Sequence, residues 1–109
     1  MNSFRKAHIY VRNNFAGLLE ETDEGYRFTY DENYLQSEFA SPVSLTLPLQ
    51  SSSYDSNTLF SFFDGLIPEG WLLDIVSRNW KISPNDRFGL LLVACKDSIG
   101  NVSVREESL

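Results

Sequence analysis

The chain has one cysteine and one histidine among its 109 residues, and this scarcity excludes several kinds of site. A single cysteine cannot form an intramolecular disulfide or a multi-cysteine zinc site. Cys95 follows an apolar run, where we expect a buried thiol that behaves as a small hydrophobic side chain. His8 alternates with apolar residues in a predicted strand, and the sequence places no nucleophile and acid beside it. We therefore expect no catalytic residue and no bound metal.

Phosphate-binding motifs are also lacking, because the six glycines never approach the spacing of a nucleotide-binding loop. Residues 86–89, Asp-Arg-Phe-Gly, have a superficial likeness to a kinase metal-binding motif, but they contain an intervening residue and fall in a predicted helix. Carboxylate pairs such as Glu20 with Glu21 lie at predicted turns, which favours solvated charge over acid–base chemistry. The sequence thus predicts a protein that is not an enzyme and binds no cofactor.

Basic residues are outnumbered, since nine Lys and Arg stand against fifteen Asp and Glu, for a net charge of −6. Nucleic acids are bound mainly through Lys and Arg contacts to phosphate. The balance therefore disfavours direct nucleic-acid binding and anionic membranes, and it favours a basic protein partner. No segment approaches the ~20 apolar residues of a membrane-spanning helix, and no signal peptide follows residues 1–6. We expect a cytoplasmic protein.

Material for a core is present, because 42% of the residues are hydrophobic and 14% are aromatic. A chain of this length favours a single domain over residues 1–109 and excludes large scaffolds such as a complete protein kinase. Three segments alternate apolar and polar residues and predict an antiparallel meander: 7–12, 15–20 and 26–30. Asn13-Asn14 predicts the first hairpin turn.

The second half of the chain is mainly helical by pattern. The expected fold class is therefore α+β, a small antiparallel sheet or meander packed with two to three helices. We expect a short helix after the N-cap Asp31, a strand over 42–48 between two prolines, a helical turn at 59–63, a helix over 71–80, a helix that opens at Ser83 and Pro84 and continues through 88–95, and a final strand at 102–104.

The longest expected helix carries an apolar arc. At about 100° per residue, Leu72, Ile75, Val76 and Trp80 share one side of this helix. Trp71 falls at the margin of the arc, so its side chain can project outward.

Several motifs occur in a characteristic order. Phe-Phe-Asp-x-Leu-Ile-Pro-Glu-Gly at 62–70 is the most diagnostic, and Pro-x-Ser-Leu-x-Leu-Pro at 42–48 is the second. With further segments at 28–35, 86–92 and 96–102, the chain resembles the N-terminal subdomain of HipA-type serine/threonine kinases from about residue 7 to 104. These kinases are the toxins of HipBA toxin–antitoxin systems.

Two positions depart from that family. Cys95 stands where the family usually has glycine before a basic residue and Asp, and Asn101 stands where it usually has alanine. Both departures indicate that this segment has lost a constraint that it carries inside the kinase.

The family continues into an ATP-binding core where this chain ends, and in this the chain resembles the small antitoxins of tripartite HipBST systems. The resemblance implies an antitoxin that binds and inhibits a HipT-like kinase toxin by occupying the place of the missing subdomain. It also implies a ternary complex with a HipB-like helix-turn-helix protein. Two alternatives stay open: an accessory subunit that completes the kinase without inhibiting it, and a transcriptional co-regulator that reaches DNA only through the HipB-like partner.

We place the partner contact in one loop and at the start of the helix after it. Proline stiffens the loop, glycine lets a partner's backbone approach, and tryptophan is a frequent interface anchor. Two assignments stay open, because Trp71 can also cover the chain's own core and Glu69 can simply favour the helix start. The predicted partner-binding residues are Leu66, Ile67, Pro68, Glu69, Gly70 and Trp71.

Overall fold

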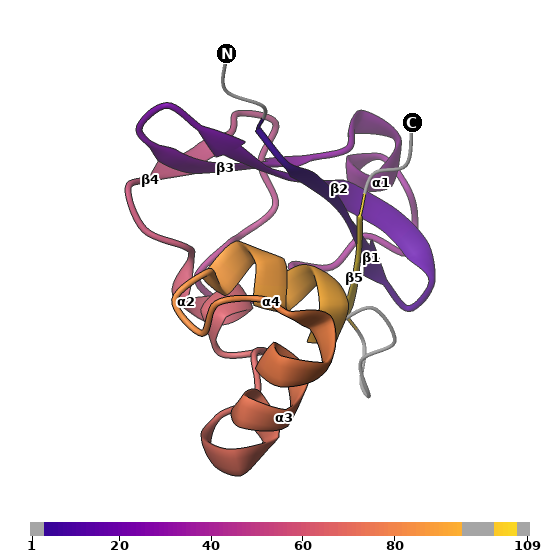
Figure 1. Cartoon of the computed structure of the whole chain (residues 1–109). Coiled ribbons are helices and arrows are strands. Elements are labelled where there is room, and N and C mark those ends of the chain that lie inside the picture. The colour runs from indigo at the N-terminus through magenta and orange to yellow at the C-terminus, as the bar shows by residue number, and fades with distance from the viewer. Residues whose placement is uncertain (1–3, 95–101, 107–109) are drawn as a thin grey trace.

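The computed structural model describes residues 4–94 and 102–106, apart from the side chains of Trp71 and Ala94. Within these ranges the chain forms one antiparallel sheet of five strands, in the order β4-β3-β2-β1-β5, together with four helices (Figure 1). This confirms the expected α+β class. In chain order the elements are β1 (Lys6–Val11), β2 (Asn14–Thr22), β3 (Gly25–Tyr30), α1 (Glu32–Leu35), β4 (Tyr54–Ser56), α2 (Ser61–Asp64), α3 (Gly70–Trp80), α4 (Arg87–Ala94) and β5 (Val102–Glu106).

The first three strands form the expected meander, with one correction at the first turn. The turn residues are Arg12 and Asn13, whose φ angles are 49° and 68°, rather than Asn13 and Asn14. Asn14 already pairs with the last residue of β1, which moves the turn one residue towards the N-terminus. Positive φ at both central positions suits the twist of a two-residue hairpin. The second turn ends at Gly25, where a Cβ would lie 2.2 Å from the carbonyl oxygen of Ser56.

The strand expected over residues 42–48 is wrong. The segment makes only an isolated bridge between Ser44 and Leu47, and the fourth strand of the sheet is β4 instead. The Tyr30 hydroxyl accepts a hydrogen bond from the Val43 N–H at 3.0 Å and donates one to the Leu47 carbonyl. A proline at either end has no N–H for a ladder, so a buried tyrosine satisfies this backbone in place of a neighbouring strand.

Side-chain caps start α1 and α4, and one expected helix start is also wrong. The Asp31 carboxylate accepts from the Tyr34 N–H at 3.1 Å and caps α1 as expected. The predicted opening at Ser83 and Pro84 is a turn, and α4 begins only at Arg87. Asp86 precedes it, and its carboxylate accepts from the Gly89 N–H at 3.1 Å. The predicted extension of this helix to Cys95 falls outside the described residues.

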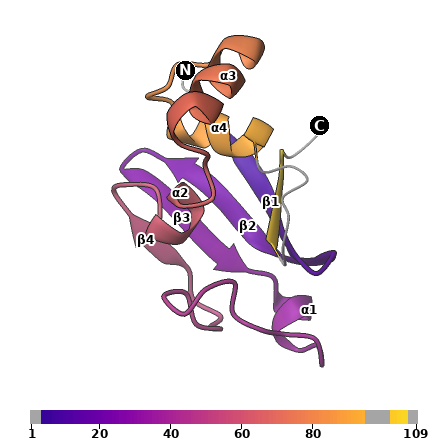
Figure 2. The same cartoon turned by 90° about the horizontal axis from the view of Figure 1, so that it is seen from below.

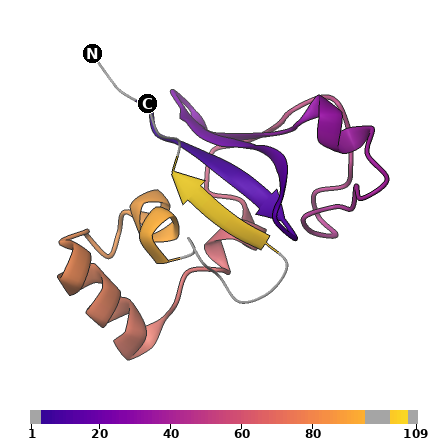
Figure 3. The same ribbon diagram turned by 90° about the vertical axis from the view of Figure 1, so that its right-hand side faces the viewer.

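The core lies between the inner face of the sheet and the helices α2 and α4 (Figure 2). Phe28 of β3 packs on Phe63 of α2 with ring centroids 5.6 Å apart, and Tyr26 stacks on Phe88 of α4 at 5.9 Å. The helix α3 lies at the end of the molecule opposite α1 (Figures 2 and 3). None of the described helices is both long enough and apolar enough to cross a lipid bilayer.

Candidate partner-binding surface

The predicted contact loop, residues 66–71, is packed against the core near its start and becomes exposed from Glu69. Ile67 is buried, with 3% of its surface exposed, and its N–H donates to the Asp64 carbonyl at 3.2 Å. Glu69 and Gly70 are exposed. Gly70 has a φ of 64°, and no atom lies within 4 Å of the place where a Cβ would stand. The loop is therefore anchored at one end and open to a partner at the other.

Trp71 is the second residue of α3, but its side chain lies outside the described part of the structure. The choice between an outward anchor and a core cover therefore stays open at this position.

Three large apolar side chains of α3 stay more than a third exposed in the described part of the chain. Leu72, Ile75 and Trp80 are 44%, 37% and 61% exposed. Helical geometry places them within an arc of about 140°, and we call this group the α3 surface. The arc that the sequence predicted therefore exists, but only Val76 within it packs against the core, and its other three members are exposed.

Few of the described side chains of α3 face the core. Among its described side chains only Ser77 is buried, and the hydroxyl of Ser77 donates to the Ile82 carbonyl just beyond the helix. Leu73 and Val76 are partly buried against the core. Lys81 ends the helix in the left-handed conformation, with a φ of 55°. The apolar content of α3 thus exceeds what its own packing uses, and an exposed group of this kind is typical of an interaction site.

The loop and α3 together form an excursion from the scaffold, residues 65–86, whose two ends are tied by an ion pair. Arg87 Nε donates to Asp64 Oδ1 at 2.8 Å, joining the first residue of α4 to the last residue of α2. The hydrogen bond to Asp64 raises the pKa of Arg87. This closure fixes the base from which the contact loop and the α3 surface project.

Arg5 holds α4 to the sheet through a second set of charged hydrogen bonds, which we call the Arg5 clamp. Its guanidinium donates to both carboxylate oxygens of Glu21 at 2.9 Å and to those of Asp86 at 2.9 and 2.8 Å. These hydrogen bonds lower the pKa values of both carboxyl groups and raise that of Arg5. Glu20 and Glu21 were both expected to be solvated charges, but Glu21 instead binds Arg5.

The Asp-Arg-Phe-Gly segment serves this clamp. A Cβ on Gly89 would lie 2.4 Å from Asp86 Oδ2 and 3.1 Å from Arg5 Nη1, so glycine leaves the room that the clamp needs. Asp86 therefore caps a helix and binds an arginine, which accounts for its position without any metal. Among the described residues, no group of three or more His, Cys, Asp or Glu side chains is arranged to hold a metal ion.

The Arg5 clamp predicts that stability falls at low pH. Both carboxyl groups have folded pKa values below their ordinary values of 4.5 for Glu21 and 3.8 for Asp86. Their contribution is therefore complete above about pH 4.5 and is lost as the pH falls through the lowered values. We expect Arg5→Met to cost about 1–2 kcal/mol at pH 7, allowing for partial exposure of the guanidinium, and much less at about pH 2.5.

Urea unfolding of both proteins at the two pH values measures this effect. Arg27→Met is the control, because it breaks the exposed Arg27–Asp55 pair and should leave the unfolding midpoint nearly unchanged. If Arg5→Met loses the same free energy of unfolding at both pH values, the stabilising role of the Arg5 clamp is contradicted.

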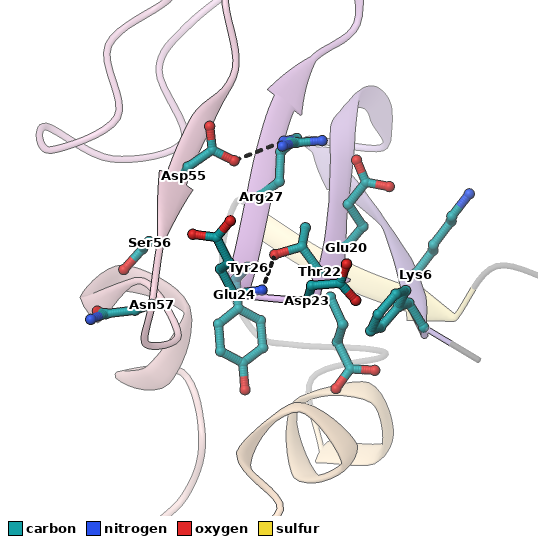
Figure 4. A pocket seen from close by; sticks show the side chains of 12 residues that line it. Lys6, Glu20, Thr22, Asp23, Glu24, Tyr26, Arg27, Asp55, Ser56 and Asn57 are labelled. Atoms are coloured by element: carbon teal, nitrogen blue, oxygen red, sulfur yellow. Dashed lines mark hydrogen bonds and ion pairs between the residues drawn. The ribbon is translucent and has the colours of Figure 1, made fainter. Parts of the chain in front are cut away.

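An open recess of about 770 Å³ lies by the β2–β3 turn, away from the contact loop (Figure 4). Its lining includes Glu20, Asp23 and Glu24, and Arg27 pairs with Asp55 across it at 2.7 Å. The described residues that line the recess include no histidine or cysteine. The arrangement favours solvated and paired charge, as the sequence indicated.

The fold is a small α+β domain with exposed apolar side chains on α3. The family model described as the HipA N-terminal domain matches residues 7–105. This chain belongs to the HipA N-terminal domain family.

Two relatives support the assignment. An uncharacterized protein of Haemophilus influenzae strain Rd is 34% identical over 103 residues, which cover 94% of this chain and 93% of the relative. A solved structure described as the N-terminal domain of HipA toxin matches with a TM-score of 0.72 at 27% identity, covering 99% of this chain and 97% of the other. The expected resemblance to the HipA subdomain is confirmed. It is consistent with a HipA-related component of a toxin–antitoxin system.

The contact loop stays a prediction from the sequence, and the sequence did not predict the exposure of α3 or the Arg5 clamp. One signal for α3 was present, since an apolar arc wider than a single buried stripe indicates a second partner for the helix. No local pattern marks the clamp, because Arg5 is 16 residues from Glu21 and 81 from Asp86 along the chain.

Proposed function

We propose that this chain is the antitoxin of a tripartite toxin–antitoxin system and that it binds and inhibits a HipT-like serine/threonine kinase. It acts by binding, in the cytoplasm, with no phosphoryl transfer of its own. The chain takes the position that the HipA N-terminal domain has in a complete toxin, and a HipB-like helix-turn-helix protein completes the complex.

The observation that carries the proposal is the α3 surface beside the contact loop, in a chain that aligns with nearly the whole HipA N-terminal domain. Three large exposed apolar side chains on one helix are typical of a surface that another protein covers. An interface of about 800 Å² on each partner is the usual size for a specific complex.

The position of the contact loop explains how binding of this chain inhibits the kinase. Glu69 and Gly70 are exposed next to the α3 surface, so a kinase that covers Leu72 and Ile75 also meets the loop. The net charge of −6 favours a basic cleft on the kinase. The loop can therefore enter a cleft while the helix supplies the apolar area that holds the complex together.

Phosphoryl transfer by the purified HipT-like kinase, measured with increasing amounts of the chain, tests the proposal. We expect activity to fall as the complex forms, and we expect the chain alone to hydrolyse no ATP. The family match also favours a second candidate, an accessory subunit that completes the kinase, because the solved relative is a domain of the toxin itself. A rise in activity would select that candidate and overturn inhibition.

A further inference from the structure

The position of α3 relative to the sheet depends on few contacts. The helix α4 lies between α3 and the sheet, and among the described helices and strands α3 packs mainly against α4 (Figures 1 and 2). Only Ser77 is buried among the described side chains of α3. The orientation of α3 therefore depends strongly on the two points at which the excursion, residues 65–86, leaves and rejoins the scaffold.

The chain rejoins the scaffold through two consecutive charged residues. Arg87 Nε donates to Asp64 Oδ1 at 2.8 Å, which ties the start of α4 to the end of α2. Asp86, one residue earlier, accepts from Arg5, and Arg5 also holds Glu21 of β2. This end of the excursion is thus held both to α2 and to the sheet.

Helix capping does not account for the charge of Arg87. Arg87 is the first residue of α4, where the helix dipole favours an acidic side chain and disfavours a cation. The Asp64 carboxylate compensates for this placement, since its hydrogen bond raises the pKa of Arg87, and the charge of Glu69 raises it further. Glu69 belongs to the contact loop, so Arg87 attracts the loop as well as α2.

The Asp64–Arg87 ion pair is expected to contribute little to the stability of the whole domain. The two side chains are 44% and 30% exposed, and both line an open recess of about 550 Å³. Ion pairs that water reaches are usually weak. The excursion has few other contacts, however, and such a segment can change its orientation while the core stays folded. A weak pair at its base therefore matters more for the orientation of α3 than for global unfolding.

We propose that Asp64 and Arg87 are positioning residues for the kinase contact. Their ion pair holds the contact loop and α3 in the orientation that binds, and neither side chain has to touch the kinase. The part that concerns the kinase rests on the proposed function, whereas the fixed orientation of α3 is a property of the chain alone. If only a fraction of the molecules has the competent orientation, the apparent affinity falls by that fraction.

Residual dipolar couplings of the isotope-labelled free chain test the orientation of α3. In the parent chain we expect one alignment tensor to fit the amides of the sheet and of α3. Asp64→Asn keeps the size of the side chain and removes its charge, and the couplings of residues 70–80 should shrink relative to those of β1, β2 and β3. Unchanged couplings would overturn the proposal. If Asp64→Asn does not fold, Arg87→Gln removes the same pair, and unfolding of both variants would overturn the proposal as well.

Binding to the HipT-like kinase is the second arm of the test. Asp64→Asn should raise the dissociation constant about three- to fivefold. The charge-swapped variant, Asp64→Arg with Arg87→Asp, should restore both the couplings and the affinity. The control Asp55→Asn makes the same change in net charge and breaks the exposed Arg27–Asp55 pair between β3 and β4, so it should change neither.

The two arms separate the possible failures. Weaker binding of Asp64→Asn with unchanged couplings would place Asp64 in the interface itself and contradict a positioning role. If the parent chain does not bind the kinase, the proposed function fails, and the couplings of the free chain still decide whether the ion pair fixes α3.

Discussion

Replacing Leu72 and Ile75 together by glutamine is expected to weaken the complex with the HipT-like kinase by about 30- to 1,000-fold. Both side chains are more than a third exposed in the chain alone, and the proposed interface buries them. Removing that apolar area costs about 2–4 kcal/mol of binding free energy. Glutamine is a good helix former, so α3 itself should remain intact.

Binding by calorimetry or surface plasmon resonance measures this loss, and circular dichroism checks the fold. The matched control replaces Asp74 and Arg78 by glutamine, since both are exposed polar residues outside the apolar arc of the same helix. We expect the control to bind within about threefold of the parent chain, as exposed polar positions at the rim of an interface usually do. Equal losses in the two double variants would remove α3 from the interface.

Trp71→Ala is expected to keep the fold and to weaken kinase inhibition by about 30- to 1,000-fold in the concentration that gives half inhibition. The residue follows Gly70, whose surroundings are open, and tryptophan at such a place is the commonest interface anchor. Truncation removes the proposed anchor and leaves α3 in place.

The comparison variant is Phe39→Ala, which removes an aromatic side chain that is 63% exposed. It lies just after α1, and α1 is at the end of the molecule away from α3 (Figure 2). Inhibition should be unchanged in this variant. If Trp71→Ala inhibits as well as the parent chain while its circular dichroism is intact, the contact loop is not the anchor. A loss of fold would instead show that Trp71 covers the core.

Local patterns predicted much of the fold because the forces behind them are local. Alternation produced the meander, and the Asp31 cap produced α1, since both depend on neighbours within a few residues. The strand expected at 42–48 failed for a non-local reason. A tyrosine hydroxyl from β3 takes the backbone groups of that segment, and no sequence pattern announces this. The helix start expected at Ser83 is wrong for a similar non-local reason. Arg5, which is distant in sequence, holds Asp86, and Asp86 caps the helix three residues further along the chain.

The sequence predicts a contact loop, but it does not predict the exposed side chains of α3 beside that loop. Pro68, Gly70 and Trp71 marked the loop, because those residue types carry conformational and contact preferences of their own. The exposure of Leu72 and Ile75 depends on how α3 packs against the rest of the chain, which no local pattern specifies.

Hydrogen–deuterium exchange of the chain, alone and bound to the HipT-like kinase, tests the central claim most directly. The account predicts slower exchange over residues 66–80 in the complex, because the contact loop and α3 become covered. Peptides from β2 and β3 should be unchanged. A stable complex in which exchange over 66–80 is the same as in the free chain would contradict the claim that this excursion restrains the kinase.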